Sequence, residues 1–283
     1  MISNPRQTED IFDMLIRSYN DLTRSETKVA DYILRNKQLI HSQSISELAS
    51  ACNVSEATIS RFCHSVGCSS FNEFKLATVH AISSSEPTIV DADLYSTVQA
   101  SDSIEQKCRK LYNVSTDALQ KTLNELDPQT IAEVARVLSD STRVFCFGQG
   151  NSSIVAEDAW GRFACVSPKF HFIANANLQS TTVELLGEGD VVLYFSFSGA
   201  VRELIEIGKV MEKSKAKLIL VTRFPNSPGA AFADHLLICG ANEAPRQQGS
   251  IAAKIGQLFI VDILFHEFCA LNEISSIFPE FTN

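Results

Sequence analysis

The chain has 283 residues, with 24 Lys and Arg against 33 Asp and Glu, so its formal net charge is −9. This length suits two domains of about 100–200 residues each, and 45% apolar with 20% charged residues excludes a wholly disordered chain. The acidic balance excludes binding to nucleic acid or anionic membrane through bulk charge alone. Residues 1–83 carry a net charge of only −1 and the remainder −8, which indicates two parts with different tasks.

Residues 1–82 are predicted to form a helical domain, because their apolar residues recur at helical spacing and no β-rich run is present. Within this domain, residues 45–67 have the layout of a helix-turn-helix. The first helix is expected from Ile45 to Ala51, and Ser55 is expected to cap the second, which Gly67 ends. Asn53 in the turn between them is expected to take the left-handed conformation.

The second of these helices is predicted to meet DNA. Its buried side should pack through apolar residues, namely Ala49, Val54, Ile59 and Phe62. The hydroxyl and charged side chains left for DNA are Ser55, Glu56, Thr58, Ser60 and Arg61, with Lys75 as a further phosphate contact. A helical bundle without DNA contacts stays the alternative. Because so few basic residues would bind DNA weakly, DNA reading requires a homodimer or homotetramer.

Residues 83–103 are small, polar and aperiodic, and are predicted to be a linker. The second domain, residues 104–283, begins with a helical pattern to about Leu138. Five short apolar runs follow, at 143–148, 168–173, 190–196, 217–222 and 235–239. Because helical stretches follow the first three runs and the runs are apolar on both faces, a doubly wound five-stranded parallel sheet is predicted.

No secretory signal or long apolar span is apparent, so a cytoplasmic chain without a membrane partner is expected. The eight cysteines lack the spacing of metal ligands and are typical of free thiols in a reducing compartment. No metal, cofactor or catalytic residue is therefore assigned.

Two loops after predicted strands have the composition of an anion site. The first is FGQGNSS, which offers Gly148, Gly150, Asn151, Ser152 and Ser153 before a helix. A dinucleotide site is disfavoured, because the third glycine of that motif is replaced by Ser153 and no acid follows about 20 residues later. The second loop, FSFSG, offers Ser196, Ser198 and Gly199. Either loop alone is also compatible with an ordinary turn, and both together favour a phosphorylated small molecule.

The residues on both sides of the linker resemble known families. The first domain resembles the helix-turn-helix domain of RpiR-family transcriptional regulators, through L-T-x-S-E at 22–26, I-x-E-L-A at 45–49, V-S-x-A-T-I-x-R-F at 54–62 and F-x-E-F-K at 71–75. The second domain is similar to the sugar isomerase (SIS) domain, through G-x-G-x-S at 148–152, S-x-S-G at 196–199, T-x(4)-S-P at 222–228 and the closing helix KIGQLFIVDILF. Val201 stands where the second loop usually carries Thr.

The resemblance implies a regulator that senses a phosphorylated sugar and changes its affinity for operator DNA. It adds Thr222 and Ser227 to the expected effector site. The SIS fold also serves isomerases, which need a general base. Glu243 is the best-placed base and Arg246 the group that would neutralise ligand charge, so a sugar-phosphate isomerase is the alternative. A sensor needs no catalytic group, and we therefore favour a regulator that is not an enzyme.

Overall fold

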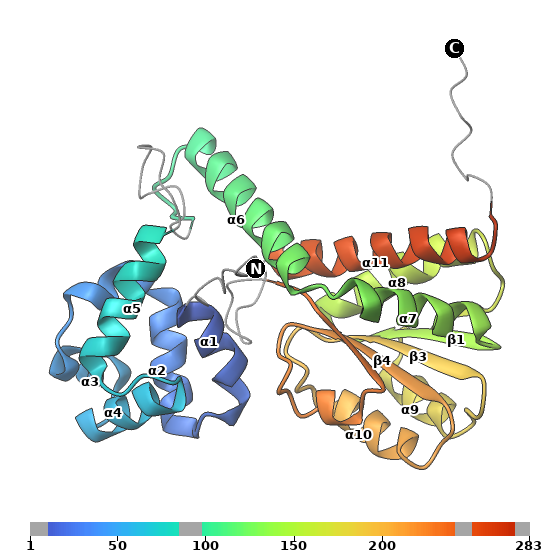
Figure 1. Ribbon diagram of the computed structural model, residues 1–283, viewed down its shortest axis with the longest axis horizontal. Helices are drawn as coiled ribbons and strands as arrows, with labels where there is room; N and C mark the ends of the chain where they lie inside the picture. The colour runs from blue at the N-terminus through green and yellow to red at the C-terminus, as the bar shows by residue number, and fades with distance from the viewer. Residues whose placement is uncertain (1–10, 85–97, 241–250, 275–283) are drawn as a thin grey trace, which may run out of the picture. The chain divides into compact units, whose positions relative to one another are not determined.

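The computed structural model describes residues 11–84, 98–240 and 251–274 (Figure 1). These residues form two compact units, which part at Lys110 and Leu111. Most of the predicted linker, residues 85–97, lies outside the described residues, as do Glu243 and Arg246.

The first unit is helical, as predicted. Its elements are α1 (Ile11–Ser18), η1 (Tyr19–Asp21), α2 (Arg24–Arg35), η2 (Lys37–Ser42), α3 (Ile45–Cys52), α4 (Glu56–Ser65) and α5 (Phe71–Ser84). The last helix therefore continues two residues past the predicted boundary at 82. Its core includes the fully buried rings of Phe62 and Phe74, which meet edge to face with centroids 5.6 Å apart.

Side-chain caps fix where these helices begin. Thr23 and Glu26 form a reciprocal capping box at α2, and Ser44 and Glu47 form another at α3. The motif L-T-x-S-E at 22–26 therefore marks the start of helix α2. Asn53 ends α3 in the left-handed conformation, with φ 52° and ψ 53°, which confirms the predicted turn. Helix α3 runs one residue further than predicted, to Cys52.

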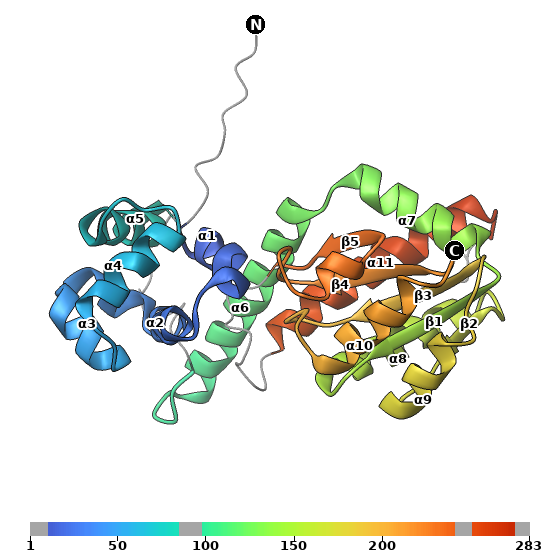
Figure 2. The same cartoon turned by 90° about the horizontal axis from the view of Figure 1, so that it is seen from below.

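The second unit contains a five-stranded parallel sheet (Figure 2). Helix α6 (Ile104–Glu125) contains the division between the units, so only its residues from Leu111 on belong to the second unit, and α7 (Pro128–Asp140) follows it. Asp127 caps α7 and so divides the predicted helical stretch. The sheet part is β1 (Arg143–Gly148), α8 (Asn151–Ala164), β2 (Phe170–Phe172), α9 (Ala176–Val183), β3 (Asp190–Phe195), α10 (Arg202–Met211), β4 (Lys217–Thr222), η4 (Ala230–Phe232), β5 (His235–Ile238) and α11 (Ala252–Leu271). The strand order is β2-β1-β3-β4-β5, which confirms the doubly wound sheet.

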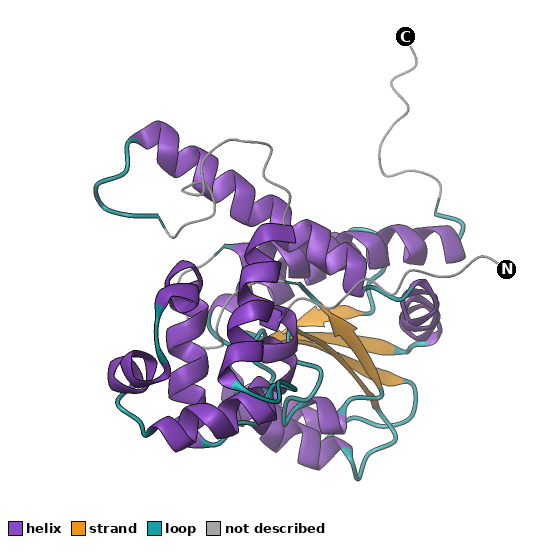
Figure 3. Cartoon of the chain, turned by 60° about the vertical axis from the view of Figure 1, so that its left-hand side comes forward, coloured by secondary structure: helices purple, strands orange, loops and turns teal. Residues whose placement is uncertain are grey.

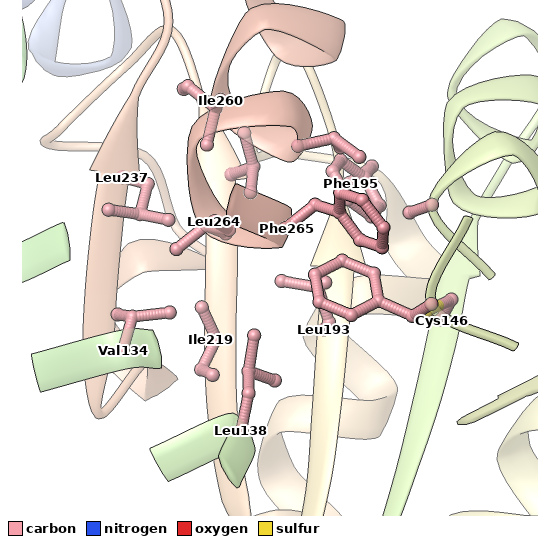
Figure 4. Close-up of a cluster of buried hydrophobic side chains, with 14 of the residues drawn as sticks. Val134, Leu138, Cys146, Leu193, Phe195, Ile219, Leu237, Ile260, Leu264 and Phe265 are labelled. Atoms are coloured by element: carbon pink, nitrogen blue, oxygen red, sulfur yellow. The ribbon is translucent and has the colours of Figure 1, made fainter. Parts of the chain in front are cut away.

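Helices cover both faces of this sheet (Figures 1 and 3). On one face α7, α8 and α11 pack over Cys146, Leu193 and Ile219 (Figure 4). On the other face α9 and α10 pack over Phe147, Tyr194 and their neighbours. Because alternate residues of each strand point to opposite faces, strands buried on both sides are apolar throughout. This explains the runs of apolar residues in the sequence.

No described helix is both long and apolar enough to cross a bilayer. The described residues also contain no group of three or more His, Cys, Asp or Glu that could hold a metal ion. All eight cysteines are free. Burial raises the pKa of the Cys146 thiol to about 12, so this side chain packs as a small neutral group.

Candidate functional sites

Helix α4 presents one face to the core of the helical unit and one to solvent. Thr58, Ile59, Phe62 and Cys63 are buried against α2, α3 and α5. The exposed residues at the start and along the outer face are Ser55, Glu56, Ala57, Ser60, Arg61 and His64. Of the residues predicted to pack the motif, Ala49, Ile59 and Phe62 are buried, whereas Val54 is only half-buried.

Thr58 lies beneath the outer face of α4, with only 5% of its surface exposed. Its hydroxyl lies 3.0 Å from that of Ser55 and accepts a hydrogen bond from Arg61 Nη2 at 3.4 Å. Ser55 also accepts from the Thr58 N–H and caps the helix. Thr58 is therefore placed to orient the side chains of Ser55 and Arg61, and its burial leaves little of it for a direct contact with DNA.

Glu56 and Lys75 both have partners within the helical unit. Glu56 accepts a hydrogen bond of 2.5 Å from Ser46 and so ties the start of α4 to α3. Lys75 Nζ donates to the carbonyl of Gln43 at 2.8 Å, which holds its charge against η2. His64 was not predicted, although it lies three and seven residues after Arg61 and Ala57, which is the spacing of one helical face.

A buried carboxylate supports the other end of α4. Glu26 of α2 accepts a hydrogen bond of 3.1 Å from Ser65. Burial alone would raise the pKa of Glu26, but hydrogen bonds from Thr23 and Ser65 and the charge of Arg61 hold this pKa below its ordinary value. The carboxylate therefore stays ionised and fixes α4 against α2.

The two predicted ligand loops lie at the topological switch point of the sheet. β1 and β3 are neighbours, and Gly148 at the end of β1 pairs with Phe195 at the end of β3. From there the chain turns to α8 on one face and to α10 on the other (Figure 2). Ligands of open α/β sheets bind at the carboxyl ends of strands where the chain diverges in this way.

The first loop depends on two glycines for different reasons. A Cβ on Gly148 would lie 2.6 Å from the carbonyl oxygen of Ser152, so only glycine lets the first turn of α8 approach β1. Gly150 has φ 56° and ψ −123°, a conformation that favours glycine. Asn151 is exposed, and Ser152 and Ser153 are half-buried. No described group forms a hydrogen bond with the hydroxyl of Ser152 or Ser153.

The second loop places hydroxyls beside the start of α10. Ser196 is buried and its hydroxyl accepts from the N–H of Gly199 at 3.2 Å, whereas Ser198 is half-buried. Val201 provides no side-chain cap, and no described group accepts a hydrogen bond from the first-turn amides at 202–204. In contrast, side chains cap α2, α3, α4, α7 and α9.

Thr222 and Ser227 lie below the second loop. Thr222 is fully buried and donates to the carbonyl of Phe197 at 3.1 Å. Ser227 is 3% exposed, and a Cβ on Gly199 would lie 2.0 Å from its hydroxyl oxygen. Thr222 therefore supports the loop through a hydrogen bond, whereas the buried Ser227 hydroxyl lies against Gly199 without a hydrogen-bond partner among the described residues.

Comparison with known proteins gives a family match for each of the two parts. A family model described as the helix-turn-helix domain of the rpiR family matches residues 11–90, and one for the SIS domain matches residues 137–267. An HTH-type transcriptional regulator of Haemophilus influenzae is 32% identical over 247 residues, covering 87% of this chain and 85% of the relative. Another from Caldanaerobacter subterraneus is 31% identical over 256 residues, covering 90% and 89%.

Solved structures share the fold. The Vibrio vulnificus NanR protein complexed with ManNAc-6P has a TM-score of 0.58 at 24% identity, over 92% of this chain and 93% of that one. The sugar isomerase domain of an RpiR transcription factor from Sphaerobacter thermophilus has a TM-score of 0.55 at 19% identity, over 60% and 93%.

Proposed function

The chain belongs to the RpiR family of helix-turn-helix transcriptional regulators, and from that premise we propose that its SIS unit binds a phosphorylated sugar and thereby changes the affinity of the helical unit for operator DNA. We assign DNA binding to residues 1–82 and effector binding to residues 104–283, joined by a linker at 83–103. Because the target is chromosomal DNA, we place the protein in the cytoplasm.

The amides at the start of α10, which bond to no described group, carry the effector proposal. A phosphate monoester bears about −1.5 to −2 charges at pH 7, and unpaired N–H groups at a helix N-terminus hold such an anion. Ser196 and Ser198 add hydroxyls in the loop before α10, and Ser152 and Ser153 add two more in the loop that follows the neighbouring strand β1. The complex of NanR with ManNAc-6P, a protein of this fold, supports a phosphosugar as the ligand class.

The outer face of α4 is our proposed DNA surface. Ser55, Ser60, Arg61 and His64 are exposed there, and Arg61 is held by Thr58. One such face offers few cations, so we propose that two or more copies bind a repeated operator together, as a homodimer or homotetramer. The ligand's effect on DNA binding then equals the ratio of its affinities for the DNA-competent and incompetent arrangements.

Titration of operator affinity against a panel of phosphosugars tests the sensor. The unphosphorylated sugars and inorganic phosphate serve as controls. We expect at least one phosphosugar to change the operator Kd, with no effect of its parent sugar at the same concentration. A response to none of the phosphosugars would refute the proposal.

Replacement of Arg61 by alanine tests the DNA surface. Loss of a base or phosphate contact should cost about 1–3 kcal/mol, or roughly 5- to 150-fold in operator affinity. Arg136→Ala is the matched control, because this exposed arginine of α7 belongs to the SIS unit. Equal operator affinity in the Arg61 and Arg136 variants would show that another surface meets DNA.

We infer sensing in place of turnover because the curated relatives that match this chain over most of their length are transcriptional regulators. The rival function is isomerisation of a sugar phosphate with Glu243 as the base. It requires turnover that disappears in Glu243→Gln while binding persists. Binding without turnover in the unaltered protein would support the sensor.

A further inference from the structure

A buried amide joins the first ligand loop to α9. Gln179 of α9 is fully buried. Its Nε2 donates to the carbonyl of Ile173 at 2.6 Å and, over a longer 3.4 Å, to that of Gly148. Its Oε1 accepts from Nε2 of Gln149 at 2.7 Å. One side chain thus uses both donors and its acceptor to connect the end of β1, the segment after β2 and the loop between Gly148 and Gly150.

Gln149 is the residue that this network orients. Its carbonyl accepts from the N–H of Ser152 at 3.0 Å, so the same residue sets the first turn of α8. The residue as a whole is half-buried, and it directly follows Gly148 in the first ligand loop. The bond to Gln179 uses one of its two N–H donors and leaves the amide oxygen and a second donor that lies near the Tyr194 hydroxyl.

A second group from β3 lies beside the Gln149 amide. Tyr194 is fully buried. Burial raises the pKa of its hydroxyl, the neighbouring Gln149 amide partly offsets this rise, and the Glu203 carboxylate of α10 adds to it. The hydroxyl lies close to Gln149 yet makes no hydrogen bond of good geometry to a described group. Gln149 therefore follows β1, which leads to the first ligand loop, and lies beside Tyr194 of β3, which leads to the second.

We propose that Gln149 is a specificity-determining contact for the uncharged carbon skeleton of the phosphosugar, and that Gln179 is the positioning residue that aims it. An amide offers a donor and an acceptor, which suits a hydroxyl or acetamido group on the sugar. The α10 amides hold the phosphate, so the two parts of the ligand meet different loops. This inference rests on the proposed phosphosugar binding.

The test compares Gln149→Met, Gln179→Met and the double variant by calorimetry on the full chain. The probes are a phosphosugar that the wild type binds and inorganic phosphate. Each single variant should weaken phosphosugar binding at least 10-fold and change phosphate binding less than 2-fold. Because Gln179 acts through Gln149, the two losses should not add: the double variant should bind the phosphosugar as tightly as the single variant with the lower affinity.

Asn175→Ala is the matched control for a loss of stability. It removes the side-chain cap of α9 and leaves the three bonds of Gln179 in place. It should lower the melting temperature but leave phosphosugar affinity within 2-fold. If it weakens binding as much as Gln179→Met does, Gln179 only stabilises the fold and the inference is wrong.

The remaining outcomes separate the two proposals. A wild-type protein that binds no phosphosugar overturns both the sensor and this inference. A wild type that binds, with unchanged affinity in Gln149→Met, overturns the inference alone. If Gln179→Met does not fold, the half-buried Gln149 variant still decides, and an equal loss of phosphate and phosphosugar affinity there counts against the inference.

Discussion

Gly199→Ala is expected to be strongly destabilising, and the structure supplies two separate reasons. Gly199 has a φ of +60°, which costs a residue with a Cβ about 1–2 kcal/mol. The added Cβ would also lie 2.0 Å from Ser227 Oγ and 2.4 Å from Ser227 Cβ. Ser227 cannot withdraw freely, because its N–H donates to Phe224 and its carbonyl accepts from Ala230.

The size of the effect follows from these two contributions. Forced overpacking costs about 1–3 kcal/mol, so Gly199→Ala should lower the free energy of unfolding by about 2–5 kcal/mol. At about 2–4 °C per kcal/mol for a unit of this size, the melting temperature should fall by roughly 4–20 °C. Denaturant unfolding and thermal melting of the full chain measure this change.

Two further glycines separate strain from overlap. Gly150 has a φ of +56° but nothing within 4 Å of its added Cβ, so Gly150→Ala should show the strain without the overlap. Gly161 lies inside α8 without a positive φ or a close neighbour, so Gly161→Ala should stabilise by about 0.4–1 kcal/mol. If Gly199→Ala loses no more stability than Gly150→Ala, contact with Ser227 is not what requires glycine there.

Three further changes test the caps, an ion pair and the turn. Val201→Thr supplies the missing cap of α10 and should raise the free energy of unfolding by about 0.5–1 kcal/mol in denaturant titrations; no gain would show that the position is not a true cap. Hydrogen bonds from Arg143 hold the pKa of Asp190 below its ordinary value despite burial. The stabilisation is therefore complete above about pH 5, begins to fade near pH 4 and is lost as pH falls through the lowered pKa of the folded state. Asp190→Asn should flatten this acid loss in melting temperatures measured from pH 7 to 3, and an unchanged slope would contradict the assignment. Asn53→Ala should destabilise by about 1 kcal/mol, because alanine tolerates the left-handed turn poorly, whereas Asn53→Gly should not.

Local signals in the sequence predicted much of the fold. Ser55 caps α4 and Asn53 turns left-handed because both effects depend on neighbouring residues. The apolar runs predicted the parallel sheet because strands buried on both faces lack polar positions. The loops at Gly148 and Ser198 were likewise visible from glycine and serine next to predicted strands.

Other features depend on contacts between distant segments. The hydroxyl of Thr58 suggested a DNA contact, but the residue is buried because it lies on the side of α4 that meets α2. Gln179 is one polar residue in a short helix, and its partners at 148, 149 and 173 are adjacent only in the folded sheet. Thr222 and Ser227 carry hydroxyl groups like the serines of the ligand loops. Their position next to Gly199 likewise depends on the tertiary fold.

The register between β1 and β3 makes the SIS unit a practical scaffold for new sensors. Because Gly148 pairs with Phe195, both ligand loops begin where the strand ladder ends. Substitutions at the exposed residues Asn151 and Ala200 therefore alter the two loops without breaking a strand hydrogen bond. Exposed positions of this kind usually tolerate change within about 0.5 kcal/mol, so a library at these two residues can vary the proposed ligand site while the folded framework is kept.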